Sequence, residues 1–428
     1  MKLRNYQNEA IEFALKHDGF ALLLEQRTGK TPIAVEIAKH RRPQRLLVVT
    51  PKIGLKMWTD AFAGVLPDAE VIIMTWRSMY SRYKKLRKWN PDGIIADESQ
   101  DAKNRSTKQS RALRLITRKD RLGELPRPGS WRLILTGTLM DTGCEDAWAQ
   151  IDFLDPTIFG TWSDFQSRYL TYGGYMGRKI VGYRNQKEFR AKLHTISYRV
   201  LLDDVKKEKT VTRNVRIRFD LEKQGSLKYY QDMEKKYAVQ LANGTRIIAS
   251  IAVAQIMKLH QISGGFIHDD EKKPHQVGDE KMATFRELVE RLEPPFVVFV
   301  RFLWELDRVA KYLSHLGYSI LRIQGGSVFR GFKEDVAVVQ IQSGILIDLA
   351  KTNEGTVVFY SFNYSHLDHE QAKFRVRSYT TNRVTYYYLI GNNTVDEDLY
   401  AIVQGKRGLT ASLLNRYEKI TGDDHGKT

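Results

Sequence analysis

Short apolar runs rich in β-branched residues recur along the chain between stretches with helical spacing. Such runs are typical of parallel strands buried on both faces, and their alternation with helices predicts βα units. The runs fall at 20–24, 46–50, 71–75, 93–96 and 132–135 in the first half, and at 296–300, 319–323, 336–341, 357–361 and 384–390 in the second. Two sets of five strands predict an α/β protein with two doubly wound parallel-sheet lobes.

A different pattern lies around the junction of the two sets. Residues 141–205 are rich in aromatic side chains and are predicted to form a helical extension with loops. Residues 222–262 are predicted to be helical, because apolar side chains recur there at spacings of three and four. We therefore expect an N-terminal lobe over 1–205 and a C-terminal lobe over 206–428, with a disordered tail after 422.

The composition narrows the class of protein. A chain of 428 residues suits two domains, and its net charge of +18 favours a polyanionic partner such as nucleic acid or an anionic membrane surface. The single cysteine, Cys144, excludes an intrachain disulfide and fits a reducing cytoplasm. The sequence contains neither an apolar run long enough for a membrane helix nor a signal-peptide core, so we expect a cytoplasmic protein without a membrane partner.

A strand, loop and helix near the start of the chain favour phosphate binding. The apolar run 20–24 ends in a tight loop, and Gly29-Lys30-Thr31 opens a helix with one apolar face. Loop N–H groups and a helix N-terminus attract phosphates, Lys30 would reach the β and γ phosphates of ATP, and the Thr31 hydroxyl would bind Mg²⁺. The alternative is that Gly-Lys-Thr occurs here by chance. The predicted strand before it and the predicted helix after it argue against that interpretation.

Two acidic residues end a second strand of the same lobe. Asp97 and Glu98 follow the run 93–96, at the strand end where open α/β sheets bind ligands. Asp97 suits the Mg²⁺ shell, and Glu98 can position and deprotonate the attacking water. An Asp-Glu turn is common by itself, but together with Lys30 it predicts an ATP-hydrolysing site.

Positive charge is concentrated in two segments of the first lobe. The segment 103–132 holds ten basic and two acidic residues, and the segment 82–89 holds five more basic residues with interleaved aromatics. Such clusters neutralise phosphates and make affinity fall steeply with salt. A single charged run is often only a solvated helix face, but two runs in one lobe favour DNA, bound mainly through its backbone and without sequence specificity.

Taken in order, short motifs along residues 3–404 resemble those of the Swi/Snf-type DNA-dependent ATPases of helicase superfamily 2. The resemblance implies two RecA-like lobes with the P-loop NTPase fold, ATP and Mg²⁺ bound between them, and double-stranded DNA across both. The matching segments are Leu3–Gln7, Glu25–Thr31, Val48–Lys52 followed by Trp58, Asp97–Gln100 followed by Lys103-Asn104, Leu135–Thr138, Leu259–Phe266, Val297–Phe299, Gln324-Gly325, Ser343–Leu349, Glu370–Arg377 and Thr394–Glu397.

The resemblance also implies roles for particular residues. The ATP-binding set would be Gln7 (which reads adenine in the family), Arg27, Thr28, Gly29, Lys30, Thr31, Gln100 and Gln371. Coupling of hydrolysis to movement would involve Thr136, Gly137, Thr138, Gly344 and Asp348. The carried-over DNA contacts are Pro51, Lys52, Thr75 and Arg301, to which the basic segments add Lys84, Lys85 and Lys103.

The chain departs from the family pattern at four motifs. Motif I lacks its second glycine, whose place Arg27 takes, and the D-E-x-H box ends in Gln100. Motif V is one residue short, and motif VI carries its second arginine one place early. Arg375 and Arg377 would point to one side of a strand but to different sides of a helix, so which of them reaches the γ-phosphate stays open.

The sequence thus predicts an ATP-driven translocase on duplex DNA, acting as a compact monomer of phage or prokaryotic type. Two alternatives remain: a strand-separating helicase of another superfamily-2 branch, and a DNA- and ATP-binding clamp with little turnover. The altered motifs V and VI motivate the clamp.

Overall fold

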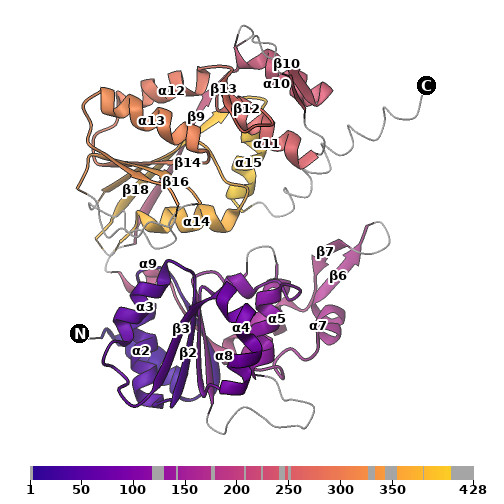
Figure 1. Cartoon of the computed structure of the whole chain (residues 1–428), viewed down its shortest axis with the longest axis vertical. Coiled ribbons are helices and arrows are strands. Elements are labelled where there is room, and N and C mark those ends of the chain that lie inside the picture. Colours follow the sequence, from indigo (N-terminus) through magenta and orange to yellow (C-terminus); the bar gives the residue numbers. More distant parts are fainter. Residues whose placement is uncertain are drawn as a thin grey trace. The chain divides into compact units, whose positions relative to one another are not determined.

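The computed structural model describes residues 3–117, 130–140, 143–174, 179–206, 209–222, 225–240, 246–248, 252–325, 333–342, 354–378 and 380–405. The contacts divide the chain into two compact units, Met1–Lys207 and Glu208–Thr428, each with its own sheet and hydrophobic core (Figure 1). Within the described residues, every helix is too short or too polar to cross a membrane.

The first unit is built on a six-stranded sheet whose neighbouring strands are all parallel. Its strand order is β3-β2-β4-β5-β1-β8. Strands β4 and β5 therefore separate β1 from β2, although β2 follows β1 in the chain. Ligands of open α/β sheets bind at the carboxyl ends of strands near such a reversal of order. The strands are β1 Gly19–Leu24, β2 Arg45–Thr50, β3 Glu70–Thr75, β4 Gly93–Asp97, β5 Trp131–Thr136 and β8 Ser197–Val200.

Helices cover both faces of this sheet because successive strand side chains point to opposite sides. Leu22 and Val48 pack with α1 Asn5–Leu15, α2 Lys30–Arg41 and α3 Gly54–Phe62 on one face. Ala21 and Leu47 pack with the helices of the other face. These are α4 Trp76–Trp89, α5 Lys108–Thr117, α6 Glu145–Leu154, α7 Trp162–Tyr169 and α8 Gln186–Ile196; the short helices η1 Ser99–Ala102 and α9 Leu202–Val205 complete the unit.

The second unit repeats the architecture with the order β15-β16-β14-β17-β18-β9, again all parallel. Phe359 meets His369 of α14, whereas its neighbour Tyr360 meets Phe285 of α12, so helices lie on both faces. The strands are β9 Val211–Phe219, β14 Phe296–Val300, β15 Ile320–Ile323, β16 Val336–Gln340, β17 Glu354–Phe359 and β18 Arg383–Gly391. The helices are α10 Ser226–Lys236, α11 Ala252–Ser263, α12 Glu280–Val289, α13 Leu303–His315, α14 His366–Arg375 and α15 Val395–Val403.

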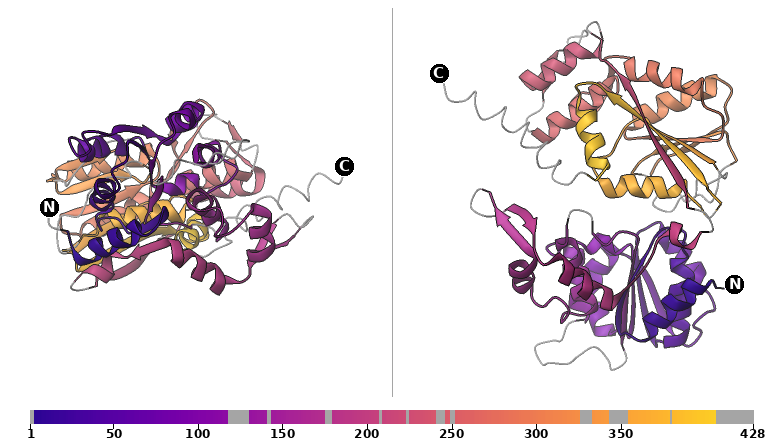
Figure 2. Two further views of the ribbon diagram at one scale, coloured as in Figure 1. Left: turned by 90° about the horizontal axis from the view of Figure 1, so that it is seen from below. Right: turned by 180° about the vertical axis from the view of Figure 1, so that it is seen from behind.

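All ten strands predicted from the apolar runs are present, which confirms the two parallel sheets. The structure adds one edge strand to each sheet: β8 beside β1, and β9 beside β18, where the two lie side by side (Figure 2). The apolar pattern missed both for a physical reason. β8 is only four residues long, and β9 leaves most of its side chains exposed, so neither forms the buried run by which a central strand is recognised.

Two segments predicted to be helical also contain strands. In 141–205, β6 Leu170–Gly173 pairs antiparallel with β7 Lys179–Tyr183 and projects beyond the helices of the unit (Figure 1). In 222–262, β10 Ala238–Gln240 and β11 Arg246–Ile248 pair between two helices. Tyr237 takes a positive φ of 53° and ends α10. A short antiparallel pair, β12 Phe266–His268 with β13 Pro274–Gln276, follows α11.

Candidate functional site

The loop between β1 and α2 is held from outside by α1. The Thr28 hydroxyl donates to the carbonyl oxygen of Glu25 at 2.7 Å, and the carbonyl oxygen of Thr28 accepts from Tyr6 Oη at 2.8 Å and from Gln7 Nε2 at 3.3 Å. Gly29 has a φ of 86°, and a Cβ there would lie 2.2 Å from Gln7 Nε2. The positive φ favours glycine at this position, because L side chains rarely adopt it, and the end of the Gln7 side chain would also have to move to admit a Cβ. Arg27 also takes a positive φ, of 68°.

Lys30 and Glu98 face each other across the carboxyl ends of β1 and β4. Lys30 is the first residue of α2, and its Nζ lies 3.2 Å from Glu98 Oε1, with the two side chains 13% and 7% exposed. The other carboxylate oxygen of Glu98 accepts from Gln100 Nε2 at 2.6 Å. The Thr31 hydroxyl contacts Met57 Sδ of α3 at 3.7 Å. A cation, a carboxylate and a helix N-terminus thus meet at one edge of the sheet, which is the arrangement that binds and hydrolyses phosphate esters.

Asp97 is held by donors from three other elements. The Thr50 hydroxyl and the Trp58 indole N–H both donate to Asp97 Oδ2 at 2.9 Å, and the Trp76 indole N–H donates to its carbonyl oxygen at 3.1 Å. Burial, and next the neighbouring Glu98 carboxylate, raise the pKa of Asp97 to about 6. Two adjacent buried carboxyl groups form a donor set that suits a divalent cation, and a cation would stabilise the ionised form of Asp97, whose pKa is raised.

These donors to Asp97 were not predicted as site residues, although Thr50 and Trp58 belong to the family-like segment Val48–Lys52 followed by Trp58. Trp58 lies in the middle of α3 and Trp76 at the start of α4, and both reach Asp97 of β4, which lies beside β2 in the sheet. The signal in the sequence was a tryptophan after each of the strands β2 and β3. A buried indole N–H needs a hydrogen-bond acceptor, which each tryptophan finds on Asp97.

A chain of hydrogen bonds joins Glu98 to the end of β5. Gln100 donates to Glu98, the Thr136 hydroxyl donates to Gln100 Oε1 at 2.8 Å, and the backbone N–H of Thr138 donates to Thr136 Oγ1 at 2.9 Å. Gly137, between the two threonines, lies against the carbonyl oxygen of Leu24, which is 3.5 Å from the position of an added Cβ. The structure therefore links Thr136 and Thr138, two of the predicted coupling residues, to the predicted catalytic acid through Gln100.

The predicted ATP-binding residues of the second unit lie in and after α14. Gln371 is 8% exposed and Arg375 is 2% exposed, whereas Arg377 is half-buried beyond the end of the helix. The guanidinium carbon of Arg377 lies 5.8 Å from the centroid of the Phe374 ring. The motif V segment, with Gly344 and Asp348, lies outside the described residues.

One face of the first unit carries positive charge without compensating acids. α4 and α5 pack against each other, and neither contains an aspartate or a glutamate. Lys108 Nζ lies 5.6 Å from the centroid of the Tyr80 ring, which places a cation of α5 against α4. We call this surface the α4–α5 face; its exposed basic residues are Arg77, Arg82, Lys84, Lys85, Lys88, Lys108 and Arg111. Residues 118–129 of the basic segment lie outside the described residues.

The remaining predicted DNA contacts have varied surroundings. Pro51 is half-buried and Lys52 exposed at the carboxyl end of β2, and Lys103 is half-buried after η1. The Thr75 hydroxyl accepts from the backbone N–H of Ser78 at 3.1 Å and caps α4.

Arg301, at the end of β14, is the one predicted DNA contact in the second unit. Its guanidinium carbon lies 5.3 Å from the centroid of the Tyr364 ring, and its backbone N–H donates to Ser361 Oγ at 2.6 Å. Burial lowers the pKa of Arg301.

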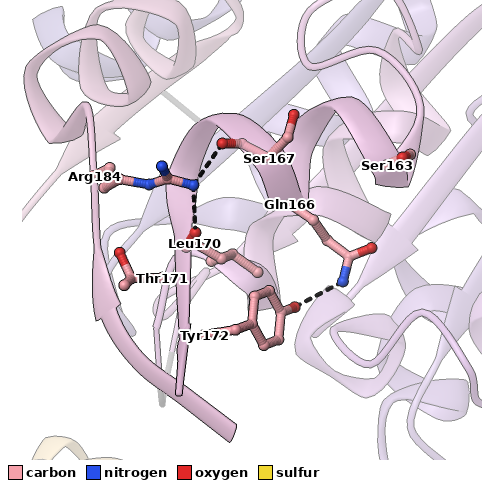
Figure 3. Close-up of a pocket in the computed structure, with 7 residues that line it drawn as sticks. All are labelled: Ser163, Gln166, Ser167, Leu170, Thr171, Tyr172 and Arg184. Atoms are coloured by element: carbon pink, nitrogen blue, oxygen red, sulfur yellow. Dashed lines mark hydrogen bonds between the residues drawn. The ribbon is translucent and has the colours of Figure 1, made fainter. Parts of the chain in front are cut away.

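A hollow of about 520 Å³ lies between α7 and the β6–β7 pair, far along the chain from the Lys30 loop (Figure 3). Its polar groups hold the two elements together. Arg184 donates to the carbonyl oxygens of Ser167 at 2.6 Å and Leu170 at 2.9 Å, and Gln166 Nε2 donates to Tyr172 Oη at 2.8 Å. These bonds cap the end of α7 and hold the projecting strands in place.

Two parallel doubly wound sheets and a phosphate loop facing a paired Asp-Glu together define a P-loop NTPase. A family model described as the SNF2-related domain matches residues 34–264, more than half of the chain. The chain belongs to the SNF2-related family.

Comparison with individual proteins agrees with this family. The chain is 24% identical over 473 residues to the "DNA annealing helicase and endonuclease ZRANB3" of Bos taurus, a match covering 100% of this chain and 42% of that protein. It is 25% identical to the "SWI/SNF-related matrix-associated actin-dependent regulator of chromatin subfamily A-like protein 1" of Xenopus laevis, over 94% of this chain and 43% of the relative. The chain thus spans less than half the length of these relatives. Both are animal proteins, and the expected phage or prokaryotic source stays a prediction.

Among solved structures, the chain is similar to the "Sulfolobus solfataricus SWI2/SNF2 ATPase core in complex with dsDNA". The similarity has a TM-score of 0.43 and 19% sequence identity, and it covers 99% of this chain and 94% of the other.

Proposed function

We propose that this protein is a DNA-dependent ATPase that translocates along duplex DNA, which it binds mainly through the phosphate backbone. The observation that carries the proposal is the buried Lys30–Glu98 pair at 3.2 Å, linked through Gln100 and Thr136 to the loop after β5, in a chain of the SNF2-related family. It supports a hydrolytic site whose catalytic acid is connected to residues that can respond to bound DNA.

The chain's own residues supply the parts that hydrolysis requires. Lys30 and the N–H groups of the Gly29 loop bind the β and γ phosphates, and this releases Glu98 from the ion pair with Lys30. Glu98 then orients a water molecule and accepts its proton while the water oxygen attacks the γ-phosphorus and the bond to the ADP oxygen breaks. Gln100, which donates to the other oxygen of Glu98, keeps the carboxylate directed at the water.

The residues present fit a magnesium ion at Asp97. Thr50 and Trp58 hold this carboxylate by a single oxygen, and its raised pKa reflects a buried negative charge that a cation would stabilise. Asp97 and the Thr31 hydroxyl would hold the ion, which when bound neutralises charge on the phosphates. The second unit would contribute an arginine to the γ-phosphate, and the half-buried Arg377 suits this role better than the buried Arg375.

DNA binding is proposed for the α4–α5 face together with Lys52 and Lys103. Seven exposed cations on two helices without an acidic residue can neutralise several phosphates and read no base sequence.

The test is phosphate release from ATP with Mg²⁺ in the presence of no DNA, single-stranded DNA, duplex DNA and forked DNA. We expect strong stimulation by duplex. Stimulation restricted to single strands or forks would favour a strand-separating helicase instead, and a forked-duplex unwinding assay would confirm that activity. ATP binding without turnover on any DNA would favour a non-hydrolysing clamp.

A further inference from the structure

A polar side chain occupies a core position of α6. Gln150 is 0% exposed and stands between the buried residues Ala149 and Ile151. Its Oε1 accepts from Ser99 Oγ at 2.6 Å, and its Nε2 donates to the carbonyl oxygens of Leu139 and Asp146, both at 2.9 Å. A buried amide is unfavourable unless its groups are satisfied, and here both ends of the amide are bonded.

Two partners of Gln150 lie beside the proposed catalytic site: Ser99 in the segment that carries Glu98, and Leu139 in the loop after β5. Ser99 lies between Glu98 and Gln100, and Leu139 follows the Thr136–Thr138 segment in the loop after β5. The segment Asp97–Gln100, which we call motif II, is therefore joined at two points to the end of β5 and the loop that follows it. Thr136 donates directly to Gln100, and Gln150 bridges Ser99 to Leu139. The bridge comes from α6, a helix outside both motifs.

We propose that Gln150 is a positioning residue of the ATPase site, a role that rests on the proposed function. By holding the Ser99 hydroxyl, it fixes the backbone that carries Glu98, which itself takes a positive φ of 49°. By holding the Leu139 carbonyl at the same time, it sets the loop after β5 relative to motif II. Gln150 therefore links α6 by hydrogen bonds both to the residue after Glu98 and to the loop after β5.

The test uses the full chain with three variants. Gln150→Met keeps an unbranched side chain of similar length but removes all three hydrogen bonds. Ser99→Ala removes only the donor to Oε1 and leaves both Nε2 bonds intact. Ile151→Val is the matched packing control. It alters the next buried position of α6, whose apolar side chain makes no hydrogen bond to motif II or to the loop after β5.

Duplex-stimulated phosphate release gives kcat and KM, a fluorescent ATP analogue gives nucleotide affinity, and thermal unfolding gives Tm. We expect Gln150→Met to lower kcat about tenfold with KM within about twofold, because a small misplacement of a catalytic group can cost that much or more. Ser99→Ala should lower kcat less, and the double variant should be no worse than Gln150→Met, since both act through one linkage. Ile151→Val should change Tm and leave kcat near the wild-type value.

Four outcomes overturn the proposal. A Gln150→Met protein with a lowered Tm but wild-type kcat would assign the residue to stability alone. Should that variant fail to fold, an unchanged kcat in Ser99→Ala overturns the proposal in its place. A wild-type chain without turnover on any DNA overturns the proposed function as well, whereas wild-type turnover with an unaffected Gln150→Met overturns the positioning role only.

Discussion

Lys30 Nζ lies 3.2 Å from Glu98 Oε1, and these two residues are brought together from the ends of strands that are separated in the sheet by β5. The pair is largely buried, and its carboxylate is the group proposed to accept a proton from water. While Lys30 is bound to Glu98, the carboxylate is partly neutralised and unsuited to that task. Phosphate binding by Lys30 and activation of Glu98 are therefore linked by competition for one ammonium group.

Replacing Glu98 by glutamine tests its role as base. Glu98→Gln keeps the shape and the acceptor for Gln100 but cannot take a proton, so kcat should fall by about 10²–10⁴-fold while ATP still binds. Single-turnover phosphate release and binding of a fluorescent ATP analogue measure the two effects. The control is Glu36→Gln on the outer surface of α2, where Glu36 pairs with Lys39 at 2.7 Å. Hydrolysis surviving in Glu98→Gln would remove Glu98 from the mechanism.

The pH dependence of ATP hydrolysis should reflect the ionisation of Asp97. Its pKa is raised to about 6 when no cation is bound, so at subsaturating Mg²⁺ activity that needs the ionised carboxylate should fall as the pH drops through about 6. The Trp58 indole N–H favours the ionised form, and Trp58→Phe should therefore move this acid limb to higher pH by about one unit. Trp89→Phe is the matched control, since the Trp89 indole donates to the surface residue Glu70 at 2.6 Å. An identical acid limb in both variants would contradict the assignment.

The buried Asp97 carboxylate should also lower the free energy of unfolding at neutral pH. Its pKa rises from 3.8 in the unfolded chain to about 6 in the folded protein, so the folded state favours the protonated form, and the free energy of unfolding falls as the pH rises through this window. Asp97→Asn removes the buried charge and still accepts from Thr50 and Trp58. We expect it to be more stable at pH 7 by about 1–3 kcal/mol, and the difference should vanish below the unfolded pKa. Urea unfolding at pH 7 and at pH 3.5 measures this, and a destabilised Asp97→Asn at pH 7 would contradict it.

The α4–α5 face should set the salt dependence of DNA binding. Lys84 and Lys85 are both exposed on α4, and replacing both by glutamine should weaken binding equally on different sequences. The slope of log affinity against log salt should shrink by roughly 0.9 for each phosphate that the variant no longer neutralises. The control is the same double replacement at Lys235 and Lys236, an adjacent exposed pair on α10. Equal effects at the two pairs would point to net charge and not to this face.

Arg375 and Arg377 should behave differently when truncated. Arg375 is 2% exposed at the last position of α14, so Arg375→Ala should mainly lower Tm. Arg377→Ala should leave Tm nearly unchanged and lower kcat by ~10³-fold if this arginine reaches the γ-phosphate. Arg377→Lys keeps the charge without the planar guanidinium, so its kcat should lie between those of the wild type and Arg377→Ala. A kcat loss confined to Arg375→Ala, without a change in Tm, would reverse the assignment.

The sequence by itself determined the central strands of both sheets and the local motifs. Strands such as β4 and β14 are buried on both faces, so their apolar runs are visible without any knowledge of neighbours. The loop at Gly29 and the acids at Asp97 and Glu98 were equally visible, because phosphate binding and acid placement depend on residues a few positions apart. The family resemblance rested on such local segments in order.

Only the tertiary structure decided the edge strands and the surroundings of the site. β9 leaves most of its side chains exposed and is a strand because β18 pairs with it. The pair β10 and β11 lies within a segment whose helical spacing predicted a helix. Thr50 and Trp58 donate to Asp97, and Ser99 donates to Gln150; each of these bonds joins residues 39 or more positions apart. The bond from Gln150 to Leu139 is the exception. Periodicity carries no information about such pairs, because each exists only after parallel strands and the helices between them have packed into one sheet.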